Sequence, residues 1–157
     1  MGQEELQPIE DGLKKLGLSI PVFIVSINKT ESSDIVAFDL NWKDLMPISG
    51  SYINIGRQKF LLFNNTRYSN NHFNFSDGYP FPIKLKIYCT QAELVDDTKT
   101  VKELIDQVYQ FSRMYWKSVR QQNLPVTIKY PEMVAEMLPH FDGNEIPEYG
   151  KDNLWFL

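Results

Sequence analysis

The chain has 157 residues, of which 43% are hydrophobic and 23% are charged, and its formal net charge is −4. This length suits one domain of ordinary size over residues 1–157, and the apolar share is sufficient for a packed core. No apolar run approaches the roughly 20 residues that span a bilayer, and the first residues lack the basic and apolar stretches of a secretory signal. We therefore expect a cytoplasmic protein without a membrane partner. Its one cysteine, Cys89, excludes an internal disulfide.

The charges are unevenly distributed along the chain. Residues 98–130 contain six Lys or Arg against two Asp or Glu, a local net charge of +4, whereas residues 131–157 have a net charge of −5. A local basic face is what contact with phosphate groups requires, because each neutralised phosphate releases a counterion. A solvated helix face explains the same pattern, so charge alone leaves both interpretations open.

Hydrophobic periodicity predicts the first elements of the chain. Apolar residues at helical spacing predict a helix over residues 3–16, which ends at Gly17. A continuous apolar run predicts a strand over residues 21–29 that is covered on both faces, and residues 34–40 are a second strand candidate.

The middle of the chain has the pattern of a hairpin, a loop and a further strand. Residues 51–56 and 59–64 are typical of two paired strands joined by a tight turn after Gly56. Residues 64–82 are polar and rich in turn formers, which predicts a long surface loop. Residues 82–89 alternate between apolar and polar side chains, which predicts a strand with one solvated face.

Two helices are expected in the C-terminal part. Thr100 and Glu103 match a capping box that opens the longest helix. Its apolar stripe, which we expect in the core, consists of Val101, Leu104, Ile105, Val108, Phe111 and Tyr115. Pro131 suits the first position of the next helix, and residues 140–157 form an irregular tail. The order of helix, strands, long helix and helix predicts an α/β fold with a mixed sheet flanked by helices.

The sequence lacks the motifs of a self-sufficient catalytic or metal site. No glycine-rich phosphate loop follows a predicted strand, and no Cys and His residues have the spacing of a zinc site. The two histidines, His72 and His140, lie near no candidate nucleophile in the sequence. Asp96 and Asp97 are explained by an exposed pair of charges before a helix. We do not expect independent catalysis, although the residues alone do not decide whether the protein contributes to an enzyme.

Residues 113–136 combine cations, aromatic rings and two predicted helix ends. Within them, Leu124-Pro-Val-Thr-Ile-Lys-Tyr-Pro-Glu-Met-Val134 resembles the C-terminal end of the PIWI domain of prokaryotic Argonaute proteins. Residues 3–17 resemble the helix that follows the third catalytic aspartate of that family, and residues 50–63 resemble its hairpin. The resemblance covers nearly the whole chain and about the last half of a PIWI domain. It implies the C-terminal portion of an RNase H-like PIWI fold.

The resemblance implies a catalytic role for one residue of this chain. The family cleaves its targets with four metal-ligating side chains, and the register places Glu132 at the fourth position. The first two acids would lie upstream of this chain, and the third would lie just before Gln3. The Mg²⁺ or Mn²⁺ ions of a complete site are therefore expected only with a partner chain. The alternative for Glu132 is a carboxylate in the first turn of a helix, which the helix dipole stabilises.

The resemblance also implies contacts with phosphates near the 5′ end of a guide strand. The positions that make these contacts in the family correspond to Tyr115, Lys117, Asn123 and Lys129, with Arg120 beside them. Tyr115 suits the core as well as a ligand contact, and the two cations on the helix suit a solvated face as well as phosphates.

The tail adds one further candidate. In several prokaryotic family members the C-terminal carboxylate helps to hold a divalent metal ion at the guide 5′-phosphate. The resemblance assigns this metal-binding role to the carboxylate of Leu157. The alternative is a tail that packs only as an apolar plug or frays.

Three functions remain open at this point. The first is guide-strand binding by a catalytically incomplete PIWI portion, with single-stranded guide RNA or DNA and its target as partners. The second is a protein-interaction module that docks on the remaining Argonaute chain or forms a homo-oligomer. The third is a nuclease half that contributes Glu132 to a metal site completed by a partner chain. The resemblance implies a pathway of host defence.

Overall fold

The computed structural model describes residues 3–30, 34–67, 79–115, 124–141, 143, 145–146 and 148–150. The elements, in chain order, are α1 (Gln3–Lys15), β1 (Phe23–Asn28), β2 (Ser51–Gly56), β3 (Lys59–Phe63), β4 (Ile83–Cys89), α2 (Glu93–Asp96), α3 (Thr98–Ser112) and α4 (Val126–Met137), followed by the short 3-10 helices η2 (Leu138–His140) and η4 (Glu148–Gly150). The predicted first helix, the hairpin, the strand after the loop and the long helix are thereby confirmed. The α/β fold class is confirmed with them.

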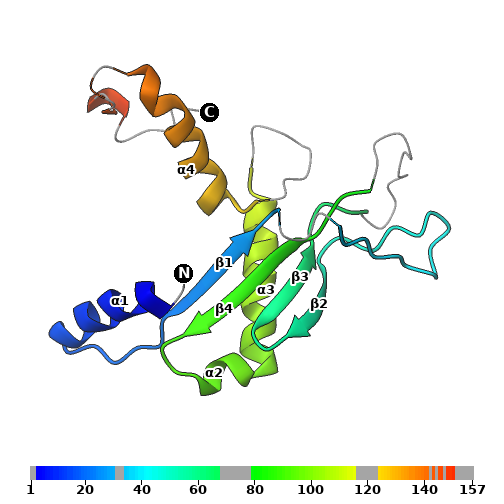
Figure 1. Cartoon of the computed structure of the whole chain (residues 1–157), viewed down its shortest axis with the longest axis horizontal. Coiled ribbons are helices and arrows are strands. Elements are labelled where there is room, and N and C mark those ends of the chain that lie inside the picture. The colour runs from blue at the N-terminus through cyan, green and yellow to red at the C-terminus, as the bar shows by residue number, and fades with distance from the viewer. Residues whose placement is uncertain are drawn as a thin grey trace.

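The four strands form one antiparallel sheet in the order β1-β4-β3-β2, and α3 lies behind one face of it (Figure 1). Among the described residues, the only parallel pairing is the isolated bridge between Ile48 and Arg67. The expected mixture of strand directions is therefore limited to this bridge. Connectivity explains this for β2 and β3, because a tight hairpin forces its two strands to run antiparallel.

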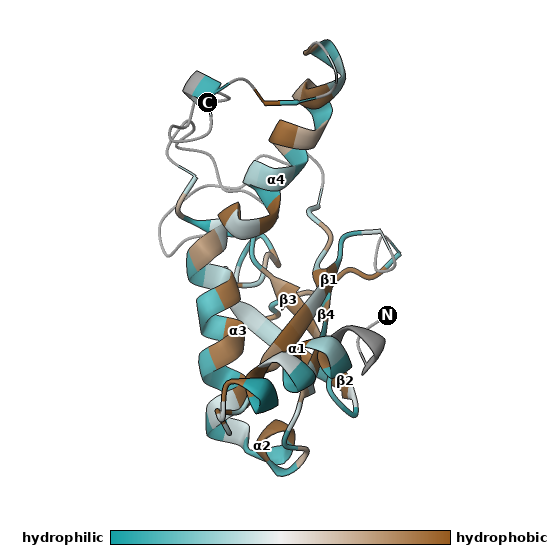
Figure 2. Cartoon of the chain, turned by 90° about the vertical axis from the view of Figure 1, so that its left-hand side faces the viewer, coloured by the Kyte–Doolittle hydropathy of each residue, from teal (hydrophilic) through white to brown (hydrophobic). Residues whose placement is uncertain are grey.

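The buried core lies between the sheet and α3. Successive side chains of a strand point to opposite faces, and the register places Phe60 beside Leu85 and Leu62 beside Ile83 on the face toward α3. In the edge-on view of Figure 2, α3 runs alongside the sheet, with apolar and polar residues alternating around its turns. The buried members of the core are Phe60, Leu62, Ile83, Leu85 and Ile87 of the sheet, Val95 of α2, and Val101, Ile105 and Val108 of α3.

The apolar stripe of the long helix is confirmed only in part. Leu104 packs against the core beside the three buried residues of α3, but the Phe111 side chain is 38% exposed. Phe111 lies near the end of α3, and Tyr115 was wrong as a member of the helix stripe, because α3 ends at Ser112. In the part of the chain that the structure describes, no helix is both long and apolar enough to cross a membrane.

β1 is an edge strand, which corrects the expectation that it is covered on both faces. Among the described strands it pairs with β4 alone, and most of its side chains are only half-buried. Phe23, Val25 and Ile27 pack against the core from one face. A continuous apolar run therefore does not by itself distinguish a central strand from an edge strand.

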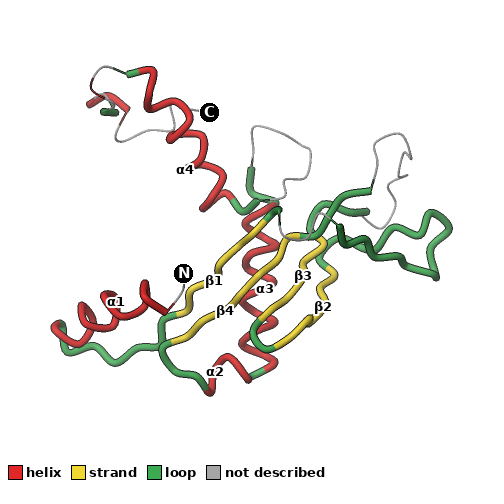
Figure 3. Tube along the Cα trace, in the orientation of Figure 1, coloured by secondary structure: helices red, strands yellow, loops and turns green. Residues whose placement is uncertain are grey.

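The strand predicted over residues 34–40 was wrong, because these residues belong to a loop that Arg67 holds (Figure 3). The guanidinium of Arg67 donates to the Asp39 carboxylate and to the backbone oxygen of Met46, each at 2.7 Å, and lies 4.0 Å from the ring centroid of Trp42. The Arg67 side chain is only 9% exposed, so these charge-assisted bonds are shielded from water. Such bonds stabilise a loop conformation that sequence alternation cannot reveal.

The long helix begins two residues before the predicted capping box. Asp97 is the N-cap, and its carboxylate accepts hydrogen bonds from the backbone N–H groups of Lys99 at 3.4 Å and of Thr100 at 3.0 Å. The capping box at Thr100 was therefore wrong. An aspartate upstream already satisfies the free N–H groups of the first turn.

The last long helix also begins earlier than predicted. α4 starts at Val126, and Pro131 lies inside it instead of at its first position. Pro125 is extended and its carbonyl accepts hydrogen bonds from Ile128 and Lys129, each at 2.9 Å, which starts the helix. Pro131 lacks an N–H group, so it leaves one carbonyl of the preceding turn without its helical partner. Burial of Pro125 anchors the helix start despite this cost.

We predict that Asp97→Ala lowers the melting temperature at pH 7 by a few degrees, because the first turn of α3 loses its cap. Hydrogen bonds from Thr100 lower the pKa of the Asp97 carboxyl below its ordinary value. A lowered folded-state pKa means that the stabilisation is present above about pH 4 and is lost as the pH falls through the folded pKa. The difference between variant and parent should therefore shrink at low pH. Thermal unfolding followed by circular dichroism at several pH values measures it.

The neighbouring Asp96→Ala is the matched control, because Asp96 is also exposed but does not cap α3. Equal losses of stability in the two variants at pH 7 would contradict the capping role of Asp97.

Candidate nucleic-acid interface

The candidate interface is built where α3 ends and α4 begins. Arg113 is the C-cap of α3, and its backbone N–H bonds to the carbonyl of Gln110 at 2.9 Å. The buried hydroxyl of Ser112 donates to the carbonyl of Tyr109 at 2.6 Å, which satisfies a carbonyl of the last turn. The end of α3 is therefore well defined, and α4 leaves from close beside it (Figure 1).

Tyr115 connects the two helices. Its hydroxyl lies 3.9 Å from the sulfur of Met133, and its ring centroid lies 6.0 Å from that of Tyr130, both on α4. The Tyr115 side chain is half-buried. The ring therefore contributes to packing between the helices, while part of it remains accessible. Both predicted roles of Tyr115, as a core residue and as a ligand contact, are therefore physically possible.

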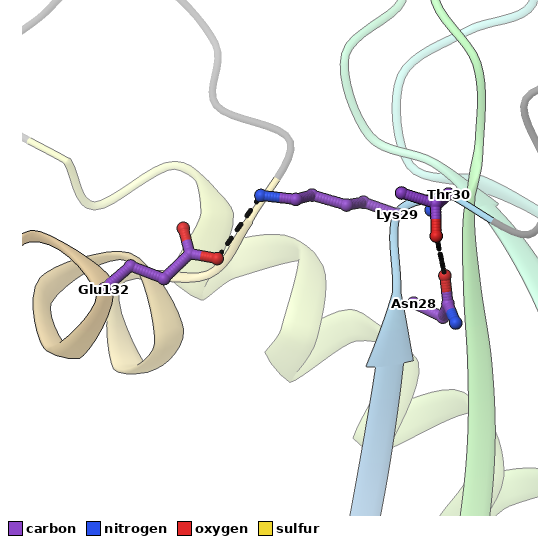
Figure 4. Close-up of polar contacts among 4 residues, drawn as sticks. All are labelled: Asn28, Lys29, Thr30 and Glu132. Carbon is purple, nitrogen blue, oxygen red and sulfur yellow. Dashed lines mark hydrogen bonds and ion pairs between the residues drawn. The ribbon is translucent and has the colours of Figure 1, made fainter. Parts of the chain in front are cut away.

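Glu132 forms an ion pair with a residue that the sequence did not single out. The Lys29 ammonium lies 3.3 Å from a carboxylate oxygen of Glu132, and the side chains are 55% and 36% exposed (Figure 4). Lys29 directly follows β1, where the Asn28 side chain accepts hydrogen bonds from the backbone and hydroxyl of Thr30 at 2.9 and 3.0 Å. These bonds order the end of β1 from which Lys29 reaches α4.

The first-turn interpretation of Glu132 was wrong. α4 starts at Val126, so Glu132 lies in the middle of the helix, where the stabilising effect of the helix N-terminus has decayed. Within the described ranges, no group of three or more His, Cys, Asp or Glu residues could hold a metal ion. The described acids therefore do not by themselves complete a Mg²⁺ or Mn²⁺ site.

Lys129 lies in the first turns of α4 and is half-buried. Of the predicted contact residues, the structure thus brings Tyr115 and Lys129 to the same helix junction. Four further predicted site residues lie outside the described residues, namely Lys117, Arg120, Asn123 and Leu157. Most of the predicted tail over residues 140–157 lies outside them as well.

Arg113 is a cation at this junction that sequence reasoning did not select. Its guanidinium lies 5.5 Å from the ring centroid of Tyr109, and burial lowers the pKa of the Arg113 side chain below its ordinary value. The sequence feature that could have identified Arg113 is its position at the start of the basic stretch that follows the long helix. The sequence contains no comparable signal for Lys29, whose partner is 103 residues away.

Comparisons with known proteins support the resemblance to the PIWI domain. No family model matches the chain. Over 80 residues it is 35% identical to a Piwi protein of Archaeoglobus fulgidus, a match that covers 42% of this chain and 19% of that protein. The fold is similar to that of Clostridium butyricum Argonaute bound to a guide DNA and a 19-mer target DNA. That similarity has a TM-score of 0.51 at 19% identity and covers 83% of this chain and 15% of the other.

The architecture is that of an α/β protein with an RNase H-like fold of the PIWI type. The chain is thus similar in sequence to a Piwi protein and similar in fold to an Argonaute protein. It spans less than a fifth of the length of each of the two proteins that it matches.

We predict that Lys29 and Glu132 stabilise the attachment of α4 weakly. A double-mutant cycle with Lys29→Met and Glu132→Gln should give a coupling of about 0.2–1 kcal/mol, because the pair is largely exposed and screened by water. The coupling should decrease with added salt. Urea unfolding of the four proteins at low and high salt measures it.

The matched control is a second cycle with Glu136→Gln, which removes a carboxylate one turn further along α4. Glu136 forms no ion pair with Lys29, so no coupling is expected there. Coupling that is equal in both cycles would contradict a specific Lys29–Glu132 contact.

Proposed function

We propose that the chain binds the backbone of a single-stranded guide nucleic acid near its 5′ end, at the junction of α3 and α4. The proposed contacts are Tyr115, Lys117, Arg120, Asn123 and Lys129. The observation that carries the proposal is the packing of Tyr115 on Tyr130 and Met133, because it joins the segment that follows α3 to α4. The solved Argonaute with a similar fold is bound to guide and target DNA, which supports this class of ligand.

The start of α4 suits a phosphate group. The N-cap is Pro125, which offers no side chain to accept hydrogen bonds from the first turn. Free backbone N–H groups and the positive end of the helix dipole favour an anion at such a position. Lys129, one turn into the helix, adds a positive charge beside them. Residues 98–130 have a net charge of +4, which makes the approach of a polyanion favourable.

Strand cleavage is not part of this proposal. Glu132 is paired with Lys29, and metal ligation by Glu132 would compete with that ion pair. A nuclease that includes this chain would therefore need further carboxylates from a partner chain, together with bound Mg²⁺ or Mn²⁺, as the family resemblance implies.

We predict that the double charge reversal Lys117→Glu/Arg120→Glu weakens binding of 5′-phosphorylated single-stranded DNA or RNA by at least about tenfold at low salt. Loss of two phosphate contacts should also reduce the slope of log K against log salt by about 1.4, at about 0.7 per contact. Fluorescence anisotropy titrations with Mg²⁺ at several salt concentrations measure both quantities.

Lys99→Glu/Lys102→Glu is the control of equal charge, because these two exposed lysines lie at the far end of α3. Equal weakening by both double variants would mean that only the net charge matters, and the proposed site would be abandoned.

Exposed apolar residues favour a second candidate function, docking on the remaining Argonaute chain or on another copy. Between α1 and β1, the exposed fractions are 73% for Leu16, 47% for Leu18 and 53% for Ile20. Three neighbouring apolar side chains in water are a feature of interaction surfaces.

If the chain associates with itself there, Leu16→Ser/Ile20→Ser should shift it from dimer to monomer at micromolar concentration, because apolar burial would no longer drive association. Light scattering coupled to gel filtration measures the mass. If the parent protein is monomeric at every concentration, self-association is excluded. Docking on another chain would then be the remaining version of this second function.

A further inference from the structure

The edge strand β1 lacks the features that usually prevent an edge from pairing with another chain. Such features are charged side chains, proline and β-bulges. β1 contains no charged residue and no proline, and its register with β4 continues without a shift from Phe23 to Asn28. The edge at β2 differs, because β2 has a register shift between Asn54 and Gly56. Among the described strands, β1 therefore has the edge best suited to further pairing.

Three residues of β1 direct their backbone groups away from the sheet. In an antiparallel pair, the N–H and C=O groups of one residue point to the same side, and this side alternates along the strand. The Thr90 N–H donates to the Val22 carbonyl at 3.1 Å, so the even-numbered residues of β1 face β4. The outward groups therefore belong to Phe23, Val25 and Ile27, and no described strand pairs with them.

The other side of β4 leads to the same assignment. The Ile87 N–H donates to the Gln58 carbonyl at 2.9 Å, so the backbone groups of Ile87 face the β2–β3 hairpin. Those of the neighbouring Lys86 consequently face β1, where Lys86 pairs with Ser26. The backbone of Ser26 is thus used within the sheet, whereas the residues on either side of it turn outward.

The same three outward residues define the side chains that a partner strand needs. Phe23, Val25 and Ile27 pack against the core from the α3 side and are only half-buried. Residues of an added strand that bond to them would place their own side chains on that same side. Apolar side chains there would cover the accessible parts of the three residues, whereas charged ones would lose hydration. An apolar residue at every second position is the pattern that fits.

Apolar surface lies near both ends of this edge. The exposed residues Leu16, Leu18 and Ile20 precede β1, and at its other end Lys29 reaches Glu132 of α4, a helix without a buried residue. In Figure 1, α1 and α4 both extend from the sheet on the side of β1. A second copy paired at this edge would bring the same two helices toward this sheet. A single extended segment is therefore favoured over a second sheet.

We propose that the β1 edge binds one extended segment of another polypeptide, which adds a strand of about six residues, the length of β1, with apolar side chains at every second position. This inference rests on the second candidate function, docking on another chain, and names the edge and the kind of segment. In both matched proteins most of the polypeptide lies outside the region that this chain matches, so further polypeptide is present there to supply such a segment.

Hydrogen exchange followed by NMR tests the proposal on the whole chain. In the free protein, the outward amides of Phe23, Val25 and Ile27 should exchange much faster than those of Ile24 and Ser26, which face β4. The probe is the peptide acetyl-Lys-Ile-Thr-Leu-Thr-Ile-Glu-amide, which has no net charge. At millimolar concentration it should slow exchange at the three outward amides by about tenfold.

Two N-methylated forms of the peptide are the matched controls. Methylation of the Leu nitrogen and of the second Ile nitrogen removes hydrogen bonds to β1 and should abolish the effect. Methylation of the two Thr nitrogens, which point away from β1, should leave it. In the protein, Val25→Pro removes one outward N–H and no bond to β4, so it should weaken peptide binding by about tenfold. The peptide controls test the proposal even if that variant does not fold.

The proposal is overturned if the outward amides exchange as slowly as their neighbours in the free protein, because the chain itself would then cover the edge. It is also overturned if the peptide leaves exchange unchanged, or if the two methylated peptides act alike. Docking through Leu16, Leu18 and Ile20 would survive these results, because Leu16→Ser/Ile20→Ser tests it separately. Guide-strand binding is tested by Lys117→Glu/Arg120→Glu, and Val25→Pro should leave it unchanged.

Discussion

Packing of one helix on one face of an antiparallel sheet is the constraint on which the rest of this structure depends. Val101, Ile105 and Val108 of α3 cover the apolar face of β3 and β4, where Leu62, Ile83, Leu85 and Ile87 are almost completely buried. Because side chains alternate along a strand, this packing also fixes what lies on the other face. A shift of the register by one residue would bury lysines against α3 and expose the core, so the placement of these lysines away from α3 is a consequence of the core.

The same helix determines where the candidate interface lies. α3 begins at the Asp97 cap, packs on the sheet through its first three turns, and ends just beyond the sheet with Ser112 buried. Its far end therefore emerges beside β1, close enough for α4 to attach through Tyr115 and through the Lys29–Glu132 ion pair. Both attachments are individually weak, since one is a partly buried ring contact and the other a mostly solvated pair. The burial of Leu124 and Pro125 adds an apolar anchor at the start of α4.

Polar interactions organise the parts of the chain that the core does not reach. Arg67 joins Asp39, Met46 and the Trp42 ring, and its backbone forms a single bridge to Ile48, which together hold the loop between β1 and β2. These partners are up to 28 residues apart in the sequence. Apolar periodicity thus determines the structure of the sheet and α3, whereas specific charge pairs stabilise the loop and help to attach α4.

The sequence by itself determined α1, the β2–β3 hairpin, β4, α3 and the family resemblance, because hydrophobic period and turn chemistry act over a few residues. It also identified the junction between the last two long helices, where Tyr115 and Lys129 lie. Only the tertiary structure decided that β1 is an edge strand, that Glu132 faces Lys29, and that Lys59 faces Lys86. Those facts depend on sheet order, register and contacts across as many as 103 residues, which no local pattern encodes.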